Sequence, residues 1–503
     1  MGPSKSAEQS HRDLEGGTTP TQDYDQGKNL TMPPQLALFW RRLMTLGAIE
    51  ETGVEPVPAH ERNETRVIGI FTLWFTLSTN LLPIVTGMVG TLSLGLGLRD
   101  ASLVILFFNL LCTTPTAYLA TLGPATGMRQ MIQARYSFGY YGVSLPVLLN
   151  LATLTGFCVI DSVVGGLTLS SVNSGRLPST VGIVIIGLIG LVVSFCGFRV
   201  LHFFERYAWI PAVIAIVVAT GCGGQHLHKQ VSSESIASAS QVLSFGALIA
   251  GFLIPWAALA SDFVTYMPPQ TPRLEVFGYT YTGLFMPTVP LMVLGAAIGG
   301  AVPNVPSWQA GYQQTSVGGV LAAMLEPAGG FGKFLVVILS LTLIGNLAAT
   351  MYAITLNFQL LIPYLVHVPR ALFAILITAI VIPVSIKAAK SFFVNLENFV
   401  GVIGYWSAAF VAVVVVEHVW LRRSDTTTYS HDIWSSPKSL PLGAAAITAG
   451  LSSIALIIPC MAQAWYTGPI GRKIGDLGFE MAFVATAFVY IVLRSIERRF
   501  IGR

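Results

Sequence analysis

The stretch TLWFTLSTNLLPIVTGMVG, residues 72–90, is apolar and long enough to cross a membrane, yet it is interrupted near its centre. Asn80 and Pro83 lie at the interruption, and Gly87 and Gly90 follow. Proline removes a backbone donor and clashes with the preceding turn, so a helix with this sequence is expected to break. Inside a bilayer the freed backbone groups need partners, and such breaks are tolerated where they line a cavity. We therefore predict a broken membrane helix in which Asn80 lines a cavity.

The remainder of the chain has the same apolar character. Of its 503 residues, 53% are hydrophobic and only 10% are charged, with a mean hydropathy of +0.67. Soluble domains carry about 25% charged residues, so we expect an integral membrane protein. A spanning helix needs about 20 apolar residues. An all-α fold with twelve transmembrane helices is predicted, at residues 67–95, 102–121, 143–170, 180–198, 207–223, 241–263, 277–301, 334–363, 371–387, 396–421, 442–466 and 477–495.

A second interrupted stretch, SFGALIAGFLIPWAALASDF at residues 244–263, contains Gly246, Gly251 and Pro255. The two broken segments are spans 1 and 6, the first members of two successive five-helix units. Broken helices at equivalent places in two halves predict a five-plus-five inverted-repeat transporter with its site near the midplane. We include Leu253 and Trp256, which flank Pro255, in the expected substrate site. The alternative is that both interruptions are ordinary proline kinks.

The predicted organisation has three parts. Residues 1–66 form a cytosolic tail, largely disordered because it is polar and rich in Gly, Pro, Ser and Thr. Residues 67–495 form the transporter domain, divided into a first repeat (67–223), a second repeat (241–421) and two further helices (442–495). Residues 496–503 form a short cytosolic tail. Basic residues in the loops are nearly balanced between the two sides. The cytosolic assignment of both ends therefore rests on the positive-inside rule applied to Arg62, Arg66, Arg494, Arg498, Arg499 and Arg503.

Span 3 carries a carboxylate at membrane depth. In LLNLATLTGFCVID, residues 148–161, Asn150, Phe157 and Asp161 share one stripe, since Phe157 and Asp161 lie within about 20° of the direction of Asn150 on a helix. A charge at the bilayer centre costs about 2.5–3.5 kcal/mol on insertion scales, so it usually faces a cavity or a partner. An amide, an aromatic ring and a carboxylate together suit a flat, hydrogen-bonding ring. The alternative is a structural carboxylate paired with a neighbouring helix.

Polar residues also mark spans 8 and 10. In span 8, Asn346, Thr350 and Asn357 are separated by four and seven residues and share one face. We expect Asn346 and Thr350 to contact substrate, and Asn357 to join helices as an amide contact. In span 10, Asn395 and Asn398 mark the polar end, where we expect them to contribute to gating.

Five motifs resemble the fungal purine–cytosine permeases of the nucleobase–cation symporter family. They are GMRQMIQARYSFGYYG (127–142), ERYAW (205–209), PWAALASDFVTY (255–266), NLENFVGVIGYW (395–406) and MAQAWYTGPIG (461–471). The resemblance covers about residues 45–500. It implies the twelve-helix inverted-repeat fold shared with sodium–leucine and sodium–hydantoin symporters, and proton-coupled uptake across the fungal plasma membrane.

The resemblance also implies roles for individual residues. Phe157 corresponds to the aromatic position on which the substrate ring stacks, and Asp161 replaces the amide that usually follows four residues later. Asn346 matches a family asparagine, whereas Thr350 replaces a second one. The bacterial sodium-dependent relative binds its ion with Ser and Thr hydroxyls in span 8. Ile344 and Gly345 stand there in this chain and offer no side-chain oxygen, which agrees with proton coupling, with Asp161 as the candidate proton carrier.

The aspartate leaves the substrate open. A neutral amide donates and accepts hydrogen bonds, whereas an ionised carboxylate only accepts, so Asp161 favours substrates with N–H donors or a positive charge. Cytosine or a purine is the first expectation, and vitamin B6 or another cationic nitrogen heterocycle or amine is the alternative. We expect no cofactor, metal or nucleic acid. An enzyme is disfavoured because the histidines are scattered at edges and loops, and a non-transporting nutrient sensor is the remote alternative.

Overall fold

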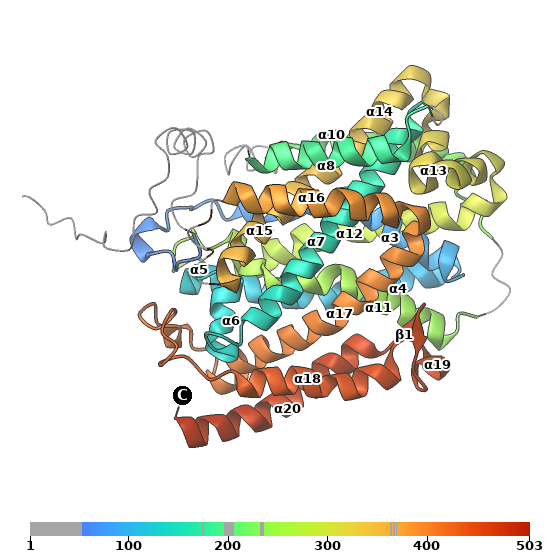
Figure 1. Cartoon of the computed structure of the whole chain (residues 1–503). Coiled ribbons are helices and arrows are strands. Elements are labelled where there is room, and N and C mark those ends of the chain that lie inside the picture. The colour runs from blue at the N-terminus through green and yellow to red at the C-terminus, as the bar shows by residue number, and fades with distance from the viewer. Residues whose placement is uncertain are drawn as a thin grey trace, which may run out of the picture. The chain divides into compact units, whose positions relative to one another are not determined.

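The computed structural model describes residues 53–173, 176–195, 206–231, 236–362, 365, 368 and 370–502, all within the unit Ala48–Arg503. Within these ranges the chain is helical apart from one two-stranded antiparallel hairpin (Figure 1). Its strands are β1 (Ala462–Gln463) and β2 (Tyr466–Thr467), with Ala462 opposite Thr467. Most of the predicted N-terminal tail lies outside the described residues.

The helices are numbered in chain order. In the first half of the unit they are α2 (Ile68–Ser78), α3 (Leu81–Met88), α4 (Leu98–Ala120), α5 (Leu122–Thr126), α6 (Gln130–Phe138), α7 (Ser144–Ser171), α8 (Ser179–Phe195) and α10 (Trp209–Gly223). In the second half they are α11 (Ala239–Leu253), α12 (Arg273–Ala301), α13 (Pro306–Leu325), α14 (Gly329–Leu341), α15 (Leu343–Leu361), α16 (Arg370–Ala388), α17 (Phe392–Val416), α18 (Ala444–Cys460), α19 (Gly471–Ile474) and α20 (Gly478–Ile501).

Each of the twelve predicted spans coincides with at least one of these helices, but twelve is not established as the number of membrane crossings. By length and composition, the described residues contain eight helices able to cross a membrane, or nine if the bent pair α2 and α3 is one span. Two shorter apolar helices, Ser179–Ser194 and Ala444–Cys460, fall below that length. Four of these helices lie outside the predicted spans: the short helices α5, α6 and α19, and the longer α13, which contains a kink at Thr315 and Ser316.

The predicted break in span 1 is present. It lies where Pro83 is expected to cause it, because a proline clashes with the carbonyl four residues before it, here that of Thr79. Helices α2 and α3 meet at an angle of 52°. The break lies at Asn80, which caps α3: its Oδ1 accepts from the Leu82 N–H (2.8 Å) and its Nδ2 donates to the Leu77 carbonyl (2.7 Å). Pro83 lies in the first turn of α3, where a missing N–H costs no helical hydrogen bond. The Asn80 amide therefore replaces hydrogen bonds that the broken helix has lost.

Asn80→Ala is expected to lower the free energy of unfolding by at least about 1 kcal/mol, the usual cost of losing an N-cap. The loss of the Nδ2 hydrogen bond adds to this cost. Thermal unfolding of detergent-solubilised protein measures this change. Asn80→Asp keeps the acceptor and should be the milder variant. If Asn80→Ala unfolds like the parent protein while substrate affinity falls, Asn80 contacts substrate and is not mainly a cap.

The predicted break in span 6 is also present. Helix α11 ends at Leu253 and continues as two short 3-10 helices, Ile254–Ala258 and Ala260–Phe263, separated by Leu259 at φ −141°. Pro255 lies at the start of the first of these. The carbonyl of Leu253 accepts a hydrogen bond from the Thr116 hydroxyl (3.4 Å), so a neighbouring helix supplies a partner for the broken backbone.

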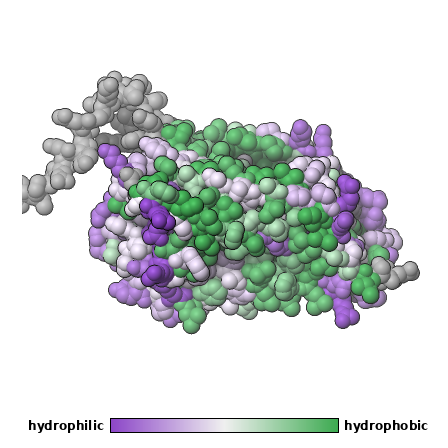
Figure 2. All heavy atoms as spheres, turned by 90° about the horizontal axis from the view of Figure 1, so that it is seen from below, coloured by the Kyte–Doolittle hydropathy of each residue, from purple (hydrophilic) through white to green (hydrophobic). Residues whose placement is uncertain are grey.

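The helices have two distinct ends. In Figure 1 the C-terminus, α5 and α6 lie at the left, which we call the terminus side. The hairpin strand β1, α19 and α13 lie at the right, which we call the hairpin side. Figure 2 shows hydrophobic atoms over the middle of one face and hydrophilic atoms at both of its ends. Side chains such as Phe107 and Phe488 are exposed. This pattern fits a protein whose middle is surrounded by lipid.

Both tail boundaries differ from the expectation of simple tails. Residues 53–66 contact the helical body: the Val57 N–H donates to the Gly127 carbonyl (2.8 Å). The Arg62 guanidinium is buried and donates to the carbonyls of Val57 and Pro124 (2.8 and 2.9 Å). At the other end, α20 continues to Ile501 rather than ending near residue 495.

Candidate functional site

The polar stripes of α7 and α15 face each other inside the protein. Asp161 is fully buried, and Asn346 is almost so. The Asn346 Nδ2 donates to both carboxylate oxygens of Asp161, at 3.1 and 3.3 Å. The carboxylate predicted at membrane depth therefore has an amide partner on the neighbouring helix. Asp161 and Asn346 belong to the third helix of the first and of the second predicted repeat.

A second amide contact joins the same two helices. The Nδ2 of Asn150 donates to the Oδ1 of Asn357 at 3.2 Å, and the Nδ2 of Asn357 donates to the Ala353 carbonyl (2.8 Å). The predicted role of Asn357 in joining helices agrees with this geometry. Asn150 was predicted to contact substrate, but its Nδ2 is engaged with Asn357. Its contribution to substrate binding stays a prediction.

Phe157 lies among aromatic rings from three other segments. Its ring is nearly parallel to that of Trp256 (26°), with centroids 6.5 Å apart. Phe399 of α17 and Phe252 of α11 present their edges to it, at 5.7 and 6.5 Å. A flat ring placed between Phe157 and Trp256 would be contacted on both faces, which is a preferred arrangement for aromatic ligands.

The other predicted site residues lie close to this group in the chain. Leu253 and Thr350 are buried, the first where α11 ends and the second one turn beyond Asn346. Two buried amide oxygens on these polar stripes lack a hydrogen-bond partner among the described residues: the Asn346 Oδ1 and the Asn150 Oδ1. Unsatisfied buried polar atoms are costly, so these are the atoms a polar ligand would satisfy.

The buried carboxyl group of Asp161 has no counter-ion: no basic side chain in the described ranges forms an ion pair with it. Burying an unpaired charge is costly. The site therefore favours states in which the carboxyl group carries a proton or lies against a cationic ligand. The described residues include no group of three His, Cys, Asp or Glu side chains that could hold a metal.

The predicted gating residues occupy different environments. The Asn395 side chain is exposed and its Nδ2 donates to the Ala388 carbonyl (2.9 Å), which ties α17 to the end of α16. The Oδ1 of Asn398 is buried without a partner among the described atoms. Further along α17, the Trp406 indole N–H donates to the Thr153 hydroxyl of α7 (2.9 Å). These contacts join α17 to its neighbours, while gating itself stays a prediction.

Sequence reasoning missed Phe252 and Phe399 as neighbours of the site. Phe399 lies within the quoted motif NLENFVGVIGYW, but an aromatic residue in an apolar helix most often faces lipid or packs in the core. Only the tertiary arrangement places these rings against Phe157.

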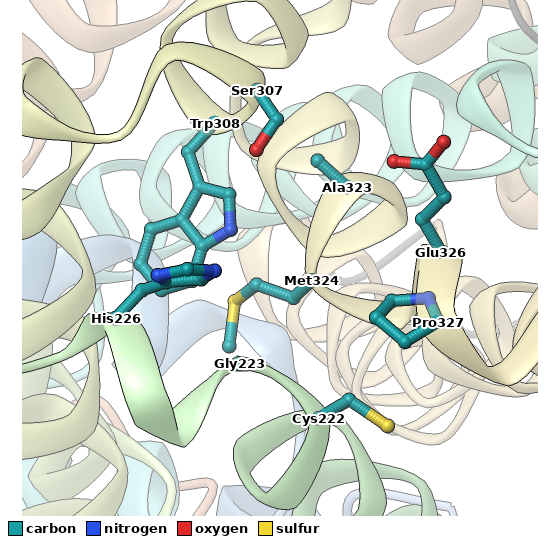
Figure 3. A pocket seen from close by; sticks show the side chains of 9 residues that line it. All are labelled: Cys222, Gly223, His226, Ser307, Trp308, Ala323, Met324, Glu326 and Pro327. Carbon is teal, nitrogen blue, oxygen red and sulfur yellow. The ribbon is translucent and has the colours of Figure 1, made fainter.

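A cavity of about 320 Å³ is lined by residues outside this group (Figure 3). It is bounded by the end of α10 and by α13, and its lining includes Cys222, His226, Trp308, Met324 and Glu326. The His226 ring meets the Trp308 ring edge-on at 5.8 Å. No predicted site residue lines this cavity, so it is separate from the group around Phe157.

Comparison with known proteins concerns the chain as a whole and identifies its relatives. The family model described as "Permease for cytosine/purines, uracil, thiamine, allantoin" matches residues 56–455. The purine-cytosine permease fcyB of Emericella nidulans is 34% identical, over 90% of each chain. The vitamin B6 transporter TPN1 of Saccharomyces cerevisiae is 26% identical, over 90% of this chain and 88% of its own.

A solved structure shows the same fold. Mhp1, a nucleobase-cation-symport-1 family transporter in a closed conformation with bromovinylhydantoin bound, superposes with a TM-score of 0.65. The comparison covers 90% of this chain and 96% of Mhp1 at 14% identity. It confirms the predicted fold class, an all-α inverted-repeat membrane fold with broken helices at spans 1 and 6.

Proposed function

Since the chain belongs to the family of permeases for cytosine, purines, uracil, thiamine and allantoin, we propose that it carries cytosine or a purine across the plasma membrane. The observation that supports this best is the pairing of Asp161 with Asn346 beside nearly parallel aromatic rings, Phe157 and Trp256. The rings suit the faces of a nucleobase, and the polar pair suits its hydrogen-bonding edge.

In this proposal the substrate ring lies between Phe157 and Trp256. Its N–H groups donate to the Asp161 carboxylate and to the unsatisfied Asn346 Oδ1, while the Asn346 Nδ2 donates to a ring nitrogen or carbonyl. The two predicted repeats, 67–223 and 241–421, each contribute one member of the polar pair. Thr350, Leu253, Asn80 and Asn150 are proposed to complete the surroundings of the substrate.

We further propose that protons drive the transport and that both termini are cytosolic, so that the hairpin side faces outward. Asp161 is a buried carboxyl group without a basic partner in the described ranges, which makes proton binding and release a natural role. Ile344 and Gly345 lack the side-chain oxygens that a sodium ion requires. The pairing of Asp161 with Asn346 provides a place where a proton and a substrate can compete or cooperate.

Uptake of radiolabelled cytosine or adenine is expected to be higher at external pH 5 than at pH 8, and to collapse when a protonophore is added. One pH unit corresponds to about 1.4 kcal/mol per proton, or a tenfold accumulation. Replacing Na⁺ by choline should leave uptake unchanged. Uptake that requires Na⁺ would overturn proton coupling and the argument from Ile344 and Gly345.

A second candidate substrate is vitamin B6 or another cationic nitrogen heterocycle, favoured by the carboxylate at position 161 and by the similarity to a vitamin B6 transporter. Competition of labelled cytosine uptake with unlabelled adenine, hypoxanthine, pyridoxine and thiamine decides between the two. Inhibition by pyridoxine with no inhibition by purines would replace the first proposal with the second. Accumulation of label inside cells separates either transporter from a nutrient sensor that does not transport, and recovery of the label unmodified argues against an enzyme.

A further inference from the structure

The segment between the hairpin and α20 contains a buried carboxylate with an unusually complete set of donors. Asp476 is 1% exposed. Its Oδ2 accepts from the Ala462 N–H (3.1 Å) and the Gln463 Nε2 (2.7 Å), and its Oδ1 accepts from the Gly478 N–H (2.8 Å). The Tyr405 hydroxyl also donates to Oδ2. These bonds compensate a charge that would otherwise be costly to bury.

The hydrogen bond from Tyr405 connects Asp476 to a distant part of the chain, because Tyr405 belongs to α17. The Gln463 Nε2 donates to the Tyr405 oxygen as well (2.6 Å), so the three side chains form a closed triangle. Gly401, one turn before Tyr405, lets the Gln463 side chain approach α17, since a Cβ there would lie 2.3 Å from Nε2. We call Tyr405, Gln463 and Asp476 the hairpin clamp.

The clamp holds the helix that covers the candidate site. Phe399 lies on α17 one and a half turns before Tyr405, and its ring packs on Phe157. It also fills the space beside Gly156, where a Cβ would lie 2.1 Å from the ring. A ligand can lie between Phe157 and Trp256 only if the surrounding rings move apart. A displacement of α17 would move the Phe399 ring away from Phe157.

Packing between α17 and α11 is incomplete near the clamp. A cavity of about 50 Å³ lies there, and its lining includes Ser244 and Leu248 of α11, Glu397 and Gly401 of α17, and Gln463 and Asp476. A space of this size holds one or two waters. Helix α17 is therefore held at this end by hydrogen bonds to a carboxylate, beside the close approach of α17 to α11 at Gly251 and Gly404.

We propose that Asp476 is a positioning residue of the transport cycle, which holds α17 closed over the site through Tyr405 and Gln463. The clamp opens when the hairpin side admits substrate. Asp476 acts through α17 and does not touch the substrate. The proposal rests on the proposed transport function, because it requires a site that opens to one side. It does not depend on which substrate is transported.

The test measures opening directly. A reporter cysteine replaces Thr350, which is buried one turn beyond Asn346 on the same face of α15, in a background where the native cysteines are replaced. Cells are treated with a membrane-impermeant methanethiosulfonate reagent, and the labelling rate is compared among Tyr405→Phe, Asp476→Asn and the parent. Tyr466→Phe is the matched control, because it removes the same hydroxyl from an exposed tyrosine of the same hairpin.

Labelling is expected to rise about tenfold in Tyr405→Phe and Asp476→Asn, because bonds to a charged group that exist only in the closed state bias the equilibrium by that order. Tyr466→Phe should label like the parent. Because Tyr405→Phe keeps the ring and its packing, it decides the question if Asp476→Asn does not reach the membrane. Unchanged labelling in a well-expressed Tyr405→Phe, or an equal rise in Tyr466→Phe, overturns the proposal. Absence of nucleobase uptake by the parent, together with the expected labelling changes in the variants, would instead count against the proposed substrate.

Discussion

Replacing Phe157 with alanine is expected to raise the KM for a nucleobase-type substrate by ten- to a hundredfold. Stacking of a base on an aromatic side chain is worth about 1–3 kcal/mol, and each 1.4 kcal/mol is a factor of ten in affinity. The truncation also removes the ring that Phe252, Phe399 and Trp256 surround. Uptake by intact cells at several substrate concentrations, normalised to surface protein, measures the change.

Two controls make this result interpretable. Phe157→Tyr keeps an aromatic face and should retain most of the affinity, so a loss in Phe157→Ala with recovery in Phe157→Tyr assigns the effect to the ring. Phe107→Ala removes an equal side chain from an exposed position on α4 and should leave KM unchanged. If Phe157→Ala reaches the surface and keeps the parent KM, Phe157 does not stack on the substrate.

The helical stripes could be predicted because they depend on periodicity alone. Asn150, Phe157 and Asp161 recur at helical spacing on α7, and Asn346 and Asn357 do so on α15. Which member of one stripe meets which member of the other depends on how the two helices are aligned along their axes. That alignment is set by packing along their whole length. The sequence therefore predicted both polar faces, but not that Asn346 would pair with Asp161 and Asn357 with Asn150.

Helix α13 and the hairpin clamp could not be predicted from local sequence patterns. Helix α13 has several glutamines and glycines and a kink at Ser316, whose φ of 54° is rare for a residue with a side chain. Its apolar run is too short to resemble a membrane span. The hairpin clamp joins Tyr405 to Gln463 and Asp476, residues far apart in the chain. Tyr405 lies within predicted span 10, but the carboxylate that accepts its hydrogen bond lies in a loop whose fold the sequence does not reveal.

The break at Thr79 and Asn80 shows how two residues combine to interrupt a helix. Proline and glycine in an apolar segment correctly indicated the interruption. The helix breaks four residues before Pro83, as the proline clash requires, and Asn80 caps the second half. Asparagine is among the strongest N-cap residues, and the combination of Asn followed by Pro three residues later would have located the break.

The substitution Asp161→Asn is expected to abolish pH-driven accumulation while leaving exchange of substrate across the membrane. It keeps the side-chain shape and the capacity to accept a hydrogen bond from Asn346, but it removes the group that binds and releases a proton. Cells expressing the variant should equilibrate labelled cytosine or adenine to a ratio near one at external pH 5, where the parent accumulates it. The measurements are uptake against pH and countertransport from preloaded cells.

The outcome also decides between the two substrate classes. If Asp161 neutralises a cationic heterocycle, Asp161→Asn loses pyridoxine-type substrates and gains cytosine or purine uptake, since it restores the amide of the purine–cytosine permeases. The double variant Asp161→Asn with Asn346→Asp is the matched control, because it moves the carboxylate to α15 and keeps the pair. It should recover part of the pH dependence if the charge itself matters. Normal surface expression of Asp161→Asn with unchanged selectivity, affinity and pH dependence would remove Asp161 from the site, because a carboxylate that binds neither proton nor substrate there has only a structural role.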